Sequence, residues 1–107
     1  MTYNVIVLYP NNDDSKFDLK YYLDTHMPLV QSSWKTDGLE SWKVNEFKPG
    51  PDGSKPQYSI GATLTFTSQD HAGKAMTGEK APKIFGDIPN FTNSQPILIA
   101  GEQVGSS

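Results

Sequence analysis

The 107-residue chain contains no cysteine, which excludes disulfides, thiolate nucleophiles, iron–sulfur clusters and cysteine-based zinc sites. It also has no cluster of lysine and arginine, and its net charge of −3 gives no concentrated basic face for nucleic acid. No apolar run approaches the ~20 residues of a membrane span, and no basic, apolar leader opens the sequence. These absences predict a cytoplasmic protein with neither nucleic acid nor membrane as a partner.

Motifs for nucleotides and metals are missing as well. No Gly-x-Gly-x-x-Gly follows a predicted strand, and Gly73-Lys74 lacks the rest of a phosphate-binding loop. The two histidines, His26 and His71, lie on different predicted helices. Asp70 beside His71 is typical of a surface pair at the start of a helix. We therefore predict no metal and no cofactor.

Length and composition indicate one domain. With 36% hydrophobic and 20% charged residues, the chain can build one hydrophobic core and is too short for two. We predict a single domain over residues 1–104. Residues 105–107, Gly-Ser-Ser, are predicted to form a flexible tail.

Apolar periodicity predicts the order of elements. Strands are predicted at residues 3–9, 39–47, 58–66 and 96–100, and a first helix at 16–34. A short second helix is predicted after the capping residues 67–70 and through Met76, with a helical turn at 81–85 and a proline-rich loop at 48–56. The order β-α-β-β-α-β predicts a ferredoxin-like α+β fold, in which a four-stranded antiparallel sheet carries helices on one face.

Local signals predict the ends of the first helix. Residues 11–15 can cap a helix that starts near Lys16, and Gly38 suits the left-handed residue that ends it. Pro28 cannot donate a hydrogen bond to the carbonyl four residues before it, so we expect a bend beside His26.

The strands carry more apolar side chains than one helical layer can cover. Pairing of two sheets in a homodimer would cover the open face and close the sheets into an α/β barrel. In strand 58–66, large apolar residues alternate with Ser, Gly and Thr. This small, polar second face could line a cavity rich in hydroxyls or simply face solvent.

His26 is the best candidate for a chemically active group. At helical spacing it shares one face with the apolar or aromatic residues Leu19, Tyr22, Leu23, Leu29 and Val30. It therefore faces inward, and an imidazole with an ordinary pKa near ~6.5 can exchange a proton at neutral pH. The alternative is a structural core histidine whose polar atoms bond a tyrosine hydroxyl or a backbone carbonyl.

Aromatic side chains could complete a site around His26. Tyr22 lies one helical turn before His26 and Tyr9 ends the first strand, so either phenol could orient the imidazole or stabilise an oxyanion. Four more aromatic residues could form flat walls for a cyclic substrate, or pack in the core or a dimer interface: Trp42, Phe66, Phe85 and Phe91.

A set of short segments, taken together, resembles the EthD family. The segments are Leu8-Tyr9-Pro10, Phe17 with Tyr21-Tyr22, Thr25-His26-Met27-Pro28-Leu29-Val30, and Asp87-Ile88-Pro89-Asn90-Phe91-Thr92 followed by Gln95-Pro96. The resemblance implies a dimeric α/β-barrel, ferredoxin-like fold with a pocket in each subunit between the helices and the sheet. It also implies that Pro89 and Asn90 shape either the mouth of the pocket or the edge of the dimer. Because some dimeric α/β barrels bind haem through a helical histidine, His71 is an alternative candidate as a haem ligand.

The resemblance implies less about the reaction. Relatives in polyketide pathways look like cofactor-free decarboxylases, dehydratases or cyclases, and the reductase label of other relatives corresponds to no cofactor motif in this sequence. Three hypotheses follow. The first is a cofactor-free lyase, isomerase or oxygenase that acts on a small hydrophobic cyclic compound with His26 as acid and base.

The second hypothesis is a non-catalytic small-molecule binding or accessory protein of an oxidative degradation pathway. The third is a structural dimer with no site. A pocket too small or too dry for any ligand would exclude the first two hypotheses.

Overall fold

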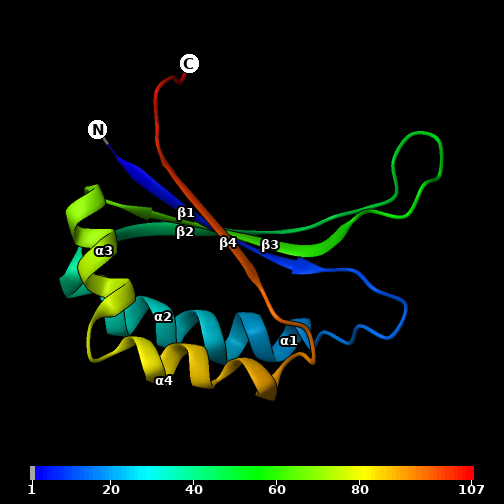
Figure 1. Cartoon of the computed structure of the whole chain (residues 1–107), viewed down its shortest axis with the longest axis horizontal. Coiled ribbons are helices and arrows are strands. Elements are labelled where there is room, and N and C mark those ends of the chain that lie inside the picture. The colour runs from blue at the N-terminus through cyan, green and yellow to red at the C-terminus, as the bar shows by residue number, and fades with distance from the viewer. Residues whose placement is uncertain (1) are drawn as a thin grey trace.

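The computed structural model describes residues 2–107; Met1, where the predicted domain begins, lies outside the described residues. One antiparallel sheet contains four strands in the order β2-β3-β1-β4. The strands are β1 (Tyr3–Pro10), β2 (Leu39–Glu46), β3 (Tyr58–Phe66) and β4 (Ile97–Glu102). Helices α1 (Leu19–Tyr21), α2 (Met27–Trp34), α3 (Gln69–Thr77) and α4 (Ala81–Gly86) lie on one side of the sheet (Figure 1). The ferredoxin-like α+β prediction is confirmed.

The first helix starts later than predicted. Residues 11–15 do not cap it, because the carboxylate of Asp18 accepts the backbone N–H of Tyr21 at 3.1 Å and makes Leu19 the first helical residue. Phe17 instead pairs with Thr92 in an isolated β-bridge. The bridge joins the segment before α1 to the segment before β4, so these two distant parts of the chain lie side by side.

At the place where Pro28 predicts a bend, the structure has a π-helical turn over Tyr22–His26, between α1 and α2. In this turn the N–H of Met27 donates to the carbonyl of Tyr22, five residues earlier. The wider turn stands directly before a proline that has no N–H to give. After α2, a 3₁₀ turn over Lys35–Asp37 ends at Gly38, whose φ of 97° confirms the predicted left-handed cap.

The core lies between the sheet and the helices. The alternate residues Val5, Val7 and Tyr9 of β1 are buried on the helix side, and Ile60, Leu64 and Phe66 of β3 follow the same pattern. On the other side of the sheet, Thr65 donates to the side chain of Asn4 at 2.9 Å. The small, polar face of β3 therefore lies away from the helices, and the interpretation that it lines a cavity is wrong for the cavity described below.

The open side of the sheet is apolar along β1 and β4. Ile6 pairs with Ile99 and Leu8 pairs with Ile97. Ile97 is 44% exposed and Ile99 is 52% exposed. Among residues 2–107, no helix is long and apolar enough to cross a membrane.

Candidate functional site

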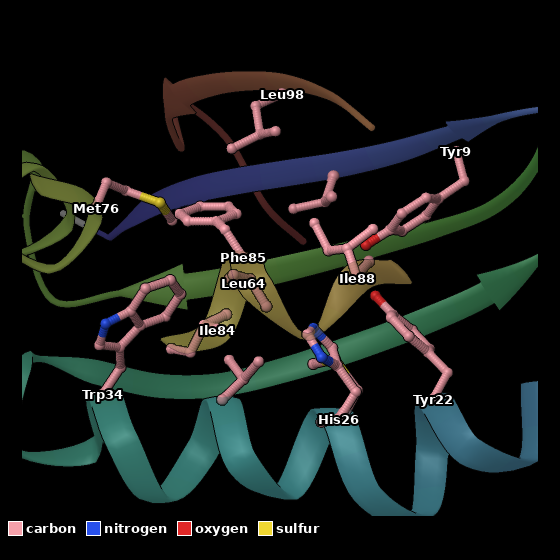
Figure 2. A pocket seen from close by; sticks show the side chains of 14 residues that line it. Tyr9, Tyr22, His26, Trp34, Leu64, Met76, Ile84, Phe85, Ile88 and Leu98 are labelled. Carbon is pink, nitrogen blue, oxygen red and sulfur yellow. The ribbon is translucent and has the colours of Figure 1, made fainter. Parts of the chain in front are cut away.

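A narrow inner cavity of about 30 Å³ lies between the helices and the sheet (Figure 2). His26, Tyr9 and Tyr22 lie at one end and Trp34 and Met76 at the other, with aliphatic side chains between. The volume holds roughly one or two water molecules. It is smaller than the pockets of about 300 Å³ or more that enclose whole ligands, so a ring-sized ligand requires the lining side chains to move.

His26 is fixed in the cavity wall by a carboxylate. It ends the π-helical turn, is 4% exposed, and places Nδ1 2.9 Å from Oδ2 of Asp87. Burial lowers the pKa of His26 below its ordinary value, and Asp87 offsets only part of that effect. The imidazole is therefore neutral at pH 7. Because an ionised carboxylate can only accept, the proton lies on Nδ1 and Nε2 keeps a free lone pair.

The carboxylate of Asp87 accepts three side-chain hydrogen bonds. Besides His26, it accepts the hydroxyl of Tyr21 at 2.7 Å and the side-chain amide of Asn90 at 2.9 Å, both on Oδ1. Burial alone would raise the pKa of Asp87, but the hydrogen bonds from Asn90, His26 and Tyr21 outweigh it and hold the pKa below its usual range. The carboxylate is thus ionised at neutral pH. Sequence reasoning missed this residue, although it opens the segment Asp87–Thr92 that carries part of the EthD resemblance.

Of the two predicted phenols, Tyr22 lies beside the imidazole, and Tyr9 packs against Tyr22. Tyr22 stacks nearly parallel on the ring of His26, with centroids 5.3 Å apart, and the hydroxyls of Tyr9 and Tyr22 point toward one another in Figure 2. Burial raises the pKa of both phenols, so both stay protonated at physiological pH. The hydrogen bond that orients His26 comes from Asp87 rather than from a tyrosine hydroxyl, which leaves the phenols as candidate donors to an oxyanion.

The predicted aromatic walls divide into two groups. Phe85 lines the inner cavity, and Phe91 lies next to it with its ring centroid 4.6 Å from that of His26. Phe66 is fully buried against Trp34 in the core and is not among the residues that line the cavity. Trp42 is on β2, where its Nε1–H donates to the side chain of Gln31 at 3.0 Å, outside the cavity.

Neither of the two predicted loop residues, Pro89 and Asn90, lines the inner cavity. Asn90 belongs to the 3₁₀ turn Ile88–Asn90 and supports Asp87 through the bond described above. Pro89 lines a separate groove at the surface. His71 is exposed and shares a hydrogen bond of 2.7 Å with Ser68. Within residues 2–107, no three His, Asp or Glu side chains lie close enough together to hold a metal ion.

No family model and no curated protein matches the sequence. An EthD-like protein of Ralstonia eutropha JMP134, however, superimposes with a TM-score of 0.89 at 28% identity, over 99% of this chain and 95% of the other. The chain is thus similar to an EthD-like protein over almost its whole length, in line with the resemblance of its sequence segments.

Two other solved structures resemble the chain in fold. An ethyl tert-butyl ether d (ethd) family protein of Bacillus halodurans C-125 aligns over 97% of this chain and 100% of its own, with a TM-score of 0.75 and 21% identity. A dimeric ferredoxin-like protein of unknown function from Jannaschia sp. CCS1 aligns over 95% of this chain and 98% of its own, with a TM-score of 0.60 and 15% identity. These two likenesses extend to the fold alone.

Proposed function

We propose that this EthD-like protein is an enzyme that carries out cofactor-free acid–base chemistry on a small hydrophobic cyclic compound, of the lyase, isomerase or oxygenase type. The observation that carries the proposal is the pairing of buried His26 Nδ1 with Asp87 Oδ2 at 2.9 Å. This pairing leaves Nε2 as a proton acceptor in a cavity wall. Together, imidazole and carboxylate form the pair used where a histidine takes up a proton during reaction.

Each residue has a distinct role in this mechanism. His26 Nε2 removes a proton from the substrate, and the nearby carboxylate of Asp87 stabilises the imidazolium that forms. Tyr9 or Tyr22 donates a hydrogen bond to the oxyanion that develops. Phe85 and the aliphatic lining keep water away, which strengthens these polar interactions. His26 then returns the proton to product.

A non-catalytic small-molecule binding or accessory role is the second candidate. The nearly all-apolar lining favours it, since such a cavity binds by burying surface and needs no proton transfer. The narrowness of the cavity favours the third hypothesis, a structural dimer with no site. Binding experiments separate these alternatives from catalysis.

We also infer a cytoplasmic homodimer. The inference is supported by the apolar open side of the sheet along Ile6, Leu8, Ile97 and Ile99, because contiguous exposed apolar side chains mark interaction sites. The Jannaschia protein of similar fold is described as dimeric.

The test compares wild type with His26→Gln in a thermal-shift screen of phenols, quinones, lactones and flavin or nicotinamide cofactors, followed by turnover assays on each hit. Glutamine can still donate to Asp87 but cannot act as a base at neutral pH. We expect hits among the cyclic compounds, with turnover lost in His26→Gln and kept in the matched control His71→Gln. Binding without turnover in wild type would favour the accessory role, and no shift with any compound would favour the structural dimer.

A further inference from the structure

We propose that the ligand extends from the inner cavity across Ile88 into an outer groove, where Gln95 binds an oxygen function at the end of the ligand opposite to His26. The inference rests on the proposed function of the inner cavity. It narrows the substrate class to flat cyclic compounds with two oxygen functions at opposite ends.

The outer groove adjoins the inner cavity. It has a volume of about 450 Å³ and is lined by Phe85, Ile88, Pro89, Thr92–Pro96 and Leu98. Phe85, Ile88 and Leu98 also line the inner cavity, so these three side chains form a common wall. Together the two spaces provide the room for a ring that the inner cavity alone lacks.

A second groove could in principle serve the same purpose. It measures about 240 Å³, includes Gln69, and shares Met76 and Leu98 with the inner cavity. Figure 2 places Met76 near Trp34, at the end of the cavity far from His26, and Ile88 close to His26. A ligand that displaces the side chain of Ile88 would therefore reach the imidazole, and the outer groove is the one that fits acid–base chemistry at His26.

The outer groove has a preorganised floor and one free polar side chain. Thr92 donates to the carbonyl of Lys16 at 2.6 Å, and Asn93 donates to that of Asp14 at 2.9 Å. Ser94 shares a hydrogen bond of 3.1 Å with Ser15. These bonds fix the segment before β4, which lowers the cost of ordering it around a ligand.

Gln95 differs from its neighbours because its exposed side chain has no hydrogen-bond partner among residues 2–107. An amide both donates and accepts, so it can bind a carbonyl or a hydroxyl. The other oxygen function of the ligand carries the proton that His26 Nε2 receives. The wall between these two residues is apolar and suits the face of a ring.

The experiment measures dissociation constants by titration calorimetry for two probes of nearly equal shape, 4-hydroxyacetophenone and 4-ethylphenol. Only the first has an oxygen opposite its phenol. We expect wild type to bind 4-hydroxyacetophenone about three- to tenfold more tightly, the effect of one added hydrogen bond. Gln95→Leu should abolish that preference. The matched control Gln69→Leu, at an exposed glutamine of the second groove, should keep it.

The other outcomes are equally distinct. Loss of the preference in Gln69→Leu alone would place the ligand in the second groove and overturn the inference. Equal binding of both probes by wild type, abolished by His26→Gln, would overturn the outer groove while leaving the proposed function intact. Failure of wild type to bind either probe would count against the His26 cavity as a ligand site and would overturn both.

Discussion

Asp87 joins a buried imidazole to two side chains nearer the surface. His26 is 4% exposed, whereas Tyr21 is half-buried and Asn90 is exposed. All three donate to the one carboxylate, so its loss would leave a buried polar group and two outer donors without their acceptor. The geometry of the imidazole thus depends on a residue that does not line the cavity.

Replacement of Asp87 by asparagine should lower the free energy of unfolding by about 1–3 kcal/mol, because an amide offers one acceptor oxygen in place of two and carries no charge. Urea unfolding measures this change. Asp24→Asn is the matched control, since Asp24 is exposed and faces only Lys20 at 3.6 Å, and it should change stability by less than about 0.5 kcal/mol. Equal effects of the two variants would argue against a special role for Asp87.

The dependence of stability on pH has a defined sign at His26. Its pKa is lower in the folded state than the ordinary ~6.5 of an unfolded chain, so the unfolded state takes up the proton first as the pH falls. Its contribution is therefore complete above about pH 6.5 and is lost below it. We expect the free energy of unfolding of wild type to decrease between pH 7 and 5, and His26→Gln to decrease less over that range. Parallel curves for the two proteins would contradict this prediction.

Asp87 acts in a lower pH window. Its folded pKa lies below the usual range of a carboxyl, so its contribution is present above about pH 4 and is lost as the pH falls further. The two groups of one hydrogen-bonded pair thus weaken the fold in separate steps during acidification.

The sequence alone predicted one residue of the pair His26 and Asp87. The helical stripe around His26 was enough to predict an inward imidazole, because the signal lies within a few residues. Asp87 lies 61 positions later, and its only local signal is its place at the start of the segment Asp87–Thr92, which says nothing about a contact with His26. Asp87 becomes the partner of His26 because α4 packs against the first helical segment. This tertiary contact joins parts of the chain that are far apart in sequence.

The first helical segment is built from α1, a π-helical turn and α2 rather than from one regular helix. Periodicity predicted one helix, and the chemistry of Pro28 predicted a bend beside His26. It could not predict the start, because several Asn, Asp and Ser residues between 11 and 18 have equal capping chemistry. The choice of Asp18 follows from the bridge between Phe17 and Thr92, which is a long-range pairing.

Gly38 is the element boundary most sensitive to substitution. It has φ 97°, and a Cβ there would lie 2.6 Å from Cβ of His71 on α3. Gly53, in the loop after β2, has φ 79° but open space around it. We expect Gly53→Ala to cost about 1 kcal/mol from backbone strain alone, and Gly38→Ala about 3 kcal/mol or more because the clash is added. Thermal and urea unfolding of the pair measure the difference, and similar costs would mean that α3 moves freely.

For the whole molecule, the order of elements was predictable because each strand and helix carries its own periodicity, and the β-α-β-β-α-β order has one common arrangement. The size of the inner cavity was not predictable. Which side of β3 meets the helices also depended on the register of all four strands, and the polar face proved to be the open one.

The open side of the sheet leads to a prediction about assembly. Ile99→Lys places a charge in the centre of the apolar patch, so it should raise the dissociation constant of the dimer about 30-fold or more. Val104→Lys, at a position 86% exposed beyond β4, is the matched control and should leave the dimer intact. Size-exclusion chromatography with light scattering measures the masses. A wild type with the 11.8 kDa mass of one chain would contradict the homodimer.

The two tryptophans of this chain occupy unlike surroundings, and that difference makes the protein its own optical reporter. Trp34 is 1% exposed at the far end of the inner cavity, whereas Trp42 is outside it, bonded to Gln31. Replacing Trp42 with phenylalanine would leave a single indole whose emission responds to the contents of the cavity. Ligand entry, solvent entry and local opening could then be followed in solution without any attached dye.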